Sequence, residues 1–75
     1  MKWALVFLFL ATGDHEPTPV TTSYEAFSLG ECQRAATLLA PSYVERRPGW
    51  TYTGRSACVP VRQLRQYLSR YGLSI

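Results

Sequence analysis

Histidine is nearly absent from this chain of 75 residues, in which His15 is the single example. A nucleophilic triad needs a base beside its nucleophile, and His15 lies in a turn-like stretch far along the sequence from both cysteines. The chain also lacks a glycine-rich phosphate-binding loop. Among its five acidic residues, Glu31 is expected to cap a helix and the others to be exposed. We therefore predict no catalytic residues, no cofactor and no enzymatic activity.

Cysteine is scarce as well. Cys32 and Cys58 are too few and too far apart for a zinc site, and no CxxC pair is present. Asp14, His15 and Glu16 carry ligand chemistry, but consecutive residues in a loop rarely converge on one ion. We expect a solvated polar turn there and no metal site. The two cysteines then form either a disulfide or two buried thiols.

Lysine occurs once and arginine seven times, within a net charge of +3. This bias favours bidentate contacts with carboxylate or phosphate groups, although a charge of +3 is by itself weak support for nucleic-acid binding. Aromatic residues, in contrast, are plentiful. They supply the large buried area that a single small domain over residues 1–75 needs for its core.

The chain opens with an apolar run, "WALVFLFLA", at residues 3–11. Both alternating faces of the run are apolar, which is typical of a central strand covered on both sides and also of the apolar segment of a signal peptide. It is too short to span a bilayer. Lys2 and the small residues 11–13 fit secretion, but residues 1–13 are shorter than the usual signal peptide. We favour the strand and keep cleavage of residues 1–13 as the alternative.

The middle of the chain predicts a strand followed by a helix. Residues 20–27 alternate and are rich in β-branched and aromatic side chains, so they should pair with the opening strand as an antiparallel hairpin. Ser28 and Glu31 form a capping-box pattern that begins a helix. Pro41 is expected to end that helix near residues 39–40.

The rest of the chain, from residue 41 onward, predicts a loop, a strand and a second helix. Breaker residues make 41–49 a loop, and residues 50–61 read as a third strand with a bulge or bend at Gly54. An apolar stripe over residues 61–71 indicates an amphipathic helix between Pro60 and Gly72. The fold class is thus α+β, in the order β-β-α-β-α. The antiparallel three-stranded sheet has the opening strand in its middle and two helices packed on it.

The two cysteines are expected to point into the same core. Cys58 shares a strand face with Trp50 and Tyr52, while Cys32 lies on the apolar stripe of the first helix, with Leu39. This placement permits a disulfide from helix to sheet. Oxidation would favour export, because disulfides are rare in the bacterial cytosol.

Three segments carry a resemblance to known proteins: "KWALVFLFL", "VTTSYEAFSLGECQRAA" and "SACVPV". Their order resembles small two-cysteine α+β proteins of bacteriophages and bacteria that have no established activity. The resemblance covers a little over half of the chain and leaves out the arginine-rich tail. It implies a phage-related protein of the host bacterial cytoplasm, and it brings no functional residues with it.

Because we expect no catalytic, cofactor or metal site, binding is the class of function that remains. We predict a non-enzymatic, inhibitor- or adaptor-like protein that acts by stoichiometric interaction with a host protein, because tyrosine, tryptophan and arginine are common at interface hot spots. One alternative is nucleic-acid contact through the arginine-rich C-terminal helix. The other is an exported, disulfide-stapled envelope or periplasmic protein. The oligomeric state is left open. The candidate binding residues are Arg46, Arg47, Trp50, Arg62, Arg65 and Tyr71.

Overall fold

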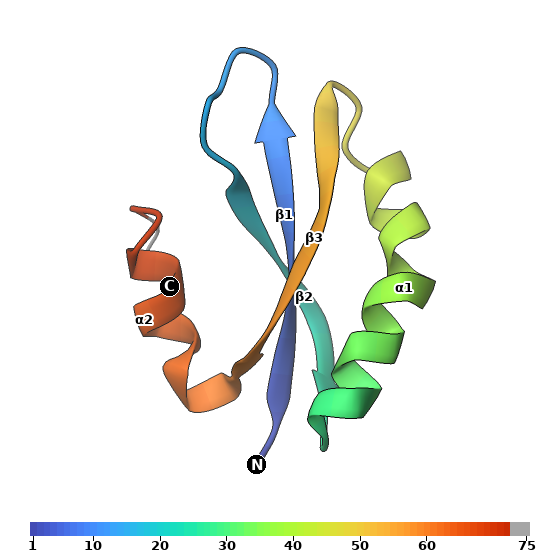
Figure 1. The fold of residues 1–75 in the computed structure, drawn as a ribbon, viewed down its shortest axis with the longest axis vertical. Coiled ribbons are helices and arrows are strands. Elements are labelled where there is room, and N and C mark those ends of the chain that lie inside the picture. Colours follow the sequence, from blue (N-terminus) through green and yellow to red (C-terminus); the bar gives the residue numbers. More distant parts are fainter. Residues whose placement is uncertain (73–75) are drawn as a thin grey trace.

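The computed structural model describes residues 1–72 and has the predicted α+β architecture, with a three-stranded antiparallel sheet between two helices (Figure 1). The strand order is β2-β1-β3, so the opening strand is central. Helix α1 covers one face of the sheet and α2 covers the other (Figure 1). In chain order the elements are β1 (Trp3–Ala11), β2 (Thr18–Ala26), α1 (Leu29–Glu45), β3 (Trp50–Pro60), the 3-10 turn η1 (Val61–Gln63) and α2 (Leu64–Ser69).

Strand β1 is buried on both sides, which explains its unbroken apolar sequence. Leu5, Phe7 and Phe9 enter the main core beneath α1, and each is fully buried. The alternate residues Ala4 and Val6 are buried on the opposite face, which α2 covers (Figure 1). Strands β2 and β3 pair with β1 and not with each other, so β1 is the element that makes the sheet one structure.

Both outer strands contain an irregularity opposite β1. Phe7 faces Ser56 and Phe9 faces Tyr52, so three residues of β3 lie across from the single residue Leu8. Gly54, predicted to mark a bulge, sits there with a φ of +81°, a conformation that glycine adopts without steric cost. A similar shift in β2 lies opposite Leu5. Because each bulge adds two residues, the side chains before and after it keep the same face.

Helix α1 begins where the capping pattern predicts. Ser28 is the N-cap, and its Oγ accepts a hydrogen bond of 3.1 Å from the backbone N–H of Glu31. Cys32, Ala35 and Ala36 form its buried stripe. Leu29, the first residue of the helix, is 41% exposed and lies outside this stripe.

The predicted end of this helix was wrong. Helix α1 runs through Pro41 to Glu45. Proline lacks the N–H that would bond to the carbonyl of Thr37, but both residues are exposed, so water can hydrate that carbonyl. The turn beyond Pro41 is anchored by Tyr43, whose ring centroid lies 5.2 Å from that of Phe7 in the core. Burial of an aromatic ring thus outweighs the local breaking tendency of proline.

The disulfide alternative for the cysteines is confirmed. Cys32 of α1 and Cys58 of β3 are bonded, with Cα atoms 6.1 Å apart. Cys32 is fully buried in the main core. The bond closes a loop of 26 residues and fastens the helix to an outer strand.

Candidate functional site

Three of the six predicted binding residues meet at the end of α1. Arg46 is the C-cap residue of the helix, and its N–H donates to the carbonyl of Ser42 at 3.3 Å. The chain then turns tightly, and the N–H of Trp50 donates to the carbonyl of Arg47 at 3.1 Å. Thr12 ties the loop after β1 to this turn, because its hydroxyl donates to the carbonyl of Gly49 at 3.0 Å. Hydrogen bonds to the end of α1 and to the loop after β1 therefore fix the backbone that carries Arg46, Arg47 and Trp50.

Each of the two guanidinium groups is stacked on an aromatic ring. The Arg46 guanidinium carbon lies 5.6 Å from the centroid of Tyr43, and that of Arg47 lies 5.7 Å from the centroid of Trp50. Such cation–π contacts restrict the long side chains before any ligand arrives. Since Tyr43 itself packs on Phe7, the first of these stacks is rooted in the core.

These residues surround a hollow of about 430 Å³. Its wall contains no acidic side chain. Within residues 1–72 the one ion pair joins Lys2 to Glu25, at 3.6 Å, so neither Arg46 nor Arg47 forms an ion pair with a carboxylate of these residues. We call this site the arginine hollow. It is lined by Val20, Thr21, Tyr43, Arg46, Arg47, Pro48 and Trp50.

The other predicted binding residues lie elsewhere. Arg62 is in η1 and Arg65 is in α2, and both border a separate surface hollow of about 580 Å³. Helix α2 and α1 lie on opposite faces of the sheet (Figure 1). Arg62 and Arg65 therefore cannot share one contact surface with the arginine hollow.

Tyr71 belongs to a third location. Its ring centroid lies 5.5 Å from that of Tyr67, and it borders the loop that contains His15. Burial, followed by the hydrogen bond and electrostatic interaction with Tyr71, raises the pKa of Tyr67 to about 12. Tyr71 is thus mainly a packing partner of α2, although 37% of it is exposed.

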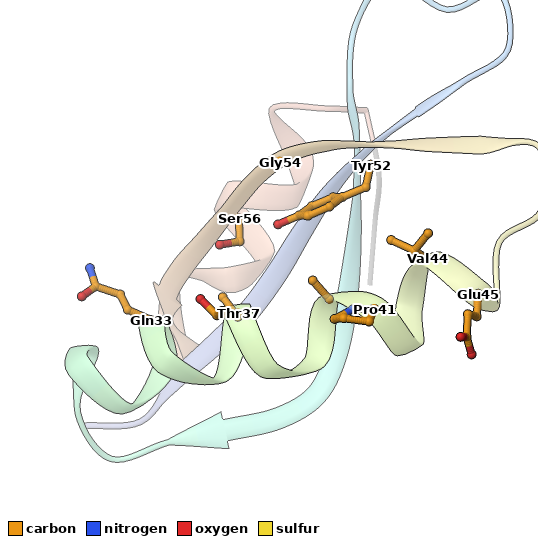
Figure 2. A pocket seen from close by; sticks show the side chains of 10 residues that line it. Gln33, Thr37, Pro41, Val44, Glu45, Tyr52, Gly54 and Ser56 are labelled. Atoms are coloured by element: carbon orange, nitrogen blue, oxygen red, sulfur yellow. The ribbon is translucent and has the colours of Figure 1, made fainter.

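Two features of the candidate binding surfaces were not predicted from the sequence. Tyr43 was placed in a loop because it follows Pro41, and no local pattern marked it as a support for arginine. The second feature is a groove of about 810 Å³ between α1 and β3. Figure 2 shows the ring of Tyr52 reaching from β3 toward the helix across this groove. The alternation of side chains along residues 50–61 predicted which face of the sheet carries Tyr52. It did not predict that α1 leaves the β3 edge of the sheet uncovered.

Within residues 1–72 no cluster of three or more metal-ligating side chains occurs, and no helix is long and apolar enough to cross a bilayer. Comparisons with protein families, curated proteins and solved structures found no match.

Proposed function

We propose that the protein is a non-enzymatic, inhibitor- or adaptor-like binding protein that engages an acidic surface of a host protein through the arginine hollow. The observation that carries the proposal is the pair of stacked guanidinium groups, Arg46 on Tyr43 and Arg47 on Trp50, in a hollow without a carboxylate. Guanidinium groups bind carboxylates in a bidentate manner. Groups that are already restrained lose less entropy on binding.

The test compares two double charge reversals that change the net charge equally. The tagged protein is used to capture partners from cells of its source organism, as wild type, as R46E/R47E and as R62E/R65E. A partner that depends on the arginine hollow is retained by R62E/R65E and lost with R46E/R47E. Titration of the purified partner should then saturate at an equimolar ratio, and the partner's mass should be unchanged after incubation.

A third variant separates binding from folding. R46K/R47K keeps the charge beyond the C-terminus of α1, where cations are favourable, but removes the planar fork and weakens the stacking. Circular dichroism should show wild-type helix content for this variant, while its affinity for the purified partner falls about tenfold or more. Equal affinity of wild type and R46K/R47K would contradict bidentate recognition.

Nucleic-acid contact is the competing outcome. A gel shift that weakens steeply with salt and is abolished by R62E/R65E, but not by R46E/R47E, would assign function to the C-terminal helix instead. The same variants thus distinguish the two hypotheses.

We further propose that the protein is phage-related, because three of its segments resemble small two-cysteine proteins of bacteriophages and bacteria. We place it in the host bacterial cytoplasm, because removal of residues 1–13 for export would remove the central strand. The Cys32–Cys58 bond is the feature that favours the exported alternative. The mass of the protein isolated from its source cells decides between an intact N-terminus and a processed one.

A further inference from the structure

The two edges of the sheet differ in their capacity to accept another strand. In an antiparallel sheet the backbone groups of successive residues point alternately to the two neighbouring strands. The carbonyls of Lys2 and Leu8 accept hydrogen bonds from β3 or the residue after it, at 3.0 and 2.8 Å, and that of Leu5 accepts one from β2, at 3.1 Å. Even-numbered residues of β1 therefore address β3, and odd-numbered residues address β2.

This alternation identifies the free backbone groups of β3. Ala57 and Val59 face the even-numbered residues Val6 and Ala4, so their N–H and C=O groups bond to β1. Ser56 precedes Ala57, and Cys58 lies between Ala57 and Val59. Ser56 and Cys58 face the odd-numbered residues Phe7 and Leu5. Their backbone groups consequently point outward from the sheet. In the part of the chain that the structure describes, nothing pairs with this edge.

The outer edge of β2, in contrast, is protected against pairing with another strand. By the same alternation, the outward-pointing residues of β2 are those facing even-numbered residues of β1, including Pro19, opposite Leu8, and Glu25, opposite Ala4. Proline offers no N–H, and a charged side chain disfavours pairing, and both are common protections of edge strands. On β3 the outward proline, Pro60, is the last residue of the strand, and the outward residues Ser56 and Cys58 carry neither protection.

A groove runs beside the open edge. Tyr52 and Ser56 line it from β3, and Gln33 and Thr37 line it from α1 (Figure 2). Because successive side chains of a strand alternate between faces, a strand added to β3 would place every second side chain in this groove. Backbone pairing gives such a complex its affinity, and the groove gives it selectivity.

Charge indicates the kind of segment that fits. Arg55 is the single charged residue of β3. Arg55 lies between Gly54 and Ser56, which line the groove, and is not itself part of the lining, so alternation directs it to the other face. Glu45 lies at one end of the groove. An incoming strand with neutral side chains toward the groove and acidic side chains on the alternate positions complements this arrangement.

We propose that the outer edge of β3, between Tyr52 and Cys58, accepts an extended acidic segment of a partner protein as a fourth strand. This rests on the proposed function, since it assumes a protein partner, but it uses a different surface from the arginine hollow. A second copy of the chain fits this edge less well, because it would bring another net charge of +3 and the proline at residue 60 to the same edge.

The test uses the full-length oxidised protein, labelled with 15N, and three synthetic peptides of about ten residues, a length typical of strand addition. The first peptide alternates glutamate with valine and threonine. The second carries lysine in place of each glutamate, and the third is the acidic peptide N-methylated at alternate backbone positions. We expect the acidic peptide to shift the amide resonances of Ser56 and Cys58 and to protect both amides from hydrogen exchange. The lysine peptide should bind about tenfold more weakly or worse, and the N-methylated peptide should give no protection.

Matched proline variants locate the pairing edge. Ser56→Pro removes an outward N–H from β3, and Glu25→Pro removes an outward N–H from β2 at a residue that lines neither the groove nor the arginine hollow. We expect Ser56→Pro to lower the affinity for the acidic peptide about tenfold, whereas Glu25→Pro, which also removes an acidic side chain, should not lower it. Arg55→Glu should reverse the preference between the acidic and lysine peptides. If Ser56→Pro does not fold, the N-methylated peptide still decides the question on the unaltered protein.

Any of the following results would overturn the proposal. One is the lack of any saturable shift at Ser56 and Cys58 up to millimolar peptide. Another is equal binding of the N-methylated and unmodified peptides. The third is concentration-dependent dimerisation, seen by sedimentation, that shifts the same two amides without peptide, since a second copy would then occupy the edge. Shifts confined to Arg46, Arg47 and Trp50 would refute pairing at β3 and leave the proposed role of the arginine hollow standing.

Discussion

Thr22 of β2 and Thr53 of β3 make equivalent pairs of hydrogen bonds at the two irregularities of the sheet. The Thr22 hydroxyl donates to the carbonyl of Leu5 at 3.1 Å and accepts from the N–H of Tyr24 at 3.1 Å. The Thr53 hydroxyl donates to the carbonyl of Leu8 at 2.8 Å and accepts from the N–H of Arg55 at 3.2 Å. Each hydroxyl replaces a ladder hydrogen bond where the outer strand carries extra residues. The carbonyls of the buried central strand are thereby kept satisfied.

The first prediction concerns these hydroxyls. Thr53→Ala should lower the free energy of unfolding by about 1–2 kcal/mol, because the Leu8 carbonyl and the Arg55 N–H both lose their partner. Urea unfolding followed by tryptophan fluorescence measures the change. Thr53→Ser keeps the hydroxyl and should recover most of the loss. Equal losses in the alanine and serine variants would mean that the methyl group, and not the hydrogen bonds, matters at this position.

The second prediction contrasts two glycines. Gly54→Ala should destabilise the protein by about 1–2 kcal/mol, since a Cβ is unfavourable at positive φ, while open space around the position rules out a clash as the cause. Gly30→Ala, in the first turn of α1, also meets open space and should stabilise the helix by up to about 1 kcal/mol. Thermal unfolding of both variants checks the opposite signs. A neutral Gly54→Ala variant would show that the bulge relaxes.

The third prediction concerns the Cys32–Cys58 bond. A closed loop of 26 residues corresponds to a stabilisation of about 3.5 kcal/mol by the loop-entropy argument, which is a large share of the stability of so small a protein. Urea unfolding with and without a reductant should differ by about this amount. Superimposable curves, with reduction confirmed by thiol titration, would contradict the expectation.

The fourth prediction concerns alkaline pH. The pKa of Tyr67 is raised to about 12, first by burial and then by its interaction with Tyr71, against an ordinary value near 10 in the unfolded chain. The folded state therefore holds this proton more tightly. The resulting stabilisation is complete below pH 10 and is lost as the pH rises through about 12.

Absorbance of tyrosinate near 295 nm follows this titration. The wild type should show a tyrosine titration near pH 12, and Tyr71→Phe should lower the pKa of Tyr67 because the hydrogen bond is gone. Thermal stability should fall between pH 10 and 12 in the wild type and fall less in Tyr71→Phe. A late titration that persists in both Tyr71→Phe and Tyr67→Phe would assign it to a different residue.

The fifth prediction concerns the N-terminus. A chain that begins at residue 14 keeps β2, β3 and both helices, but neither outer strand has a partner, and isolated strands are not stable in water. Circular dichroism and amide exchange should show an unfolded chain. Addition of a synthetic peptide of residues 1–13 should restore protection of the β2 and β3 amides. A cooperative unfolding transition of the shortened chain alone would contradict the central role of β1.

The sequence predicted the order of elements well where local patterns and burial agree. The period-two apolar pattern on both faces of residues 3–11 placed β1 in the centre of the sheet, and Ser28 marked the start of α1. Gly54 signalled the bulge in β3. The matching bulge at Thr22 has no glycine, so nothing in the local sequence distinguished it from regular strand.

The candidate site was only partly predictable, because its arrangement depends on contacts between distant residues. Arg46, Arg47 and Trp50 were predicted as binding residues without any statement that they share one site, and the structure places all three around the arginine hollow. The position of Tyr43 beneath Arg46 depends on its contact with Phe7, which is far away in sequence and overrides the breaker at Pro41. The separation of Arg62 and Arg65 from that site depends on which face α2 covers, and an amphipathic pattern does not specify this.

The central position of β1 also has a consequence for biosynthesis. Its apolar residues leave the ribosome before β3, the second neighbouring strand that shields them, which is translated about 40–60 residues later. Until then the edge of β1 that pairs with β3 is open to other chains. The three-stranded sheet can therefore form only after β3 has been translated, and the yield of folded protein should depend on how well chaperones protect β1 in the meantime.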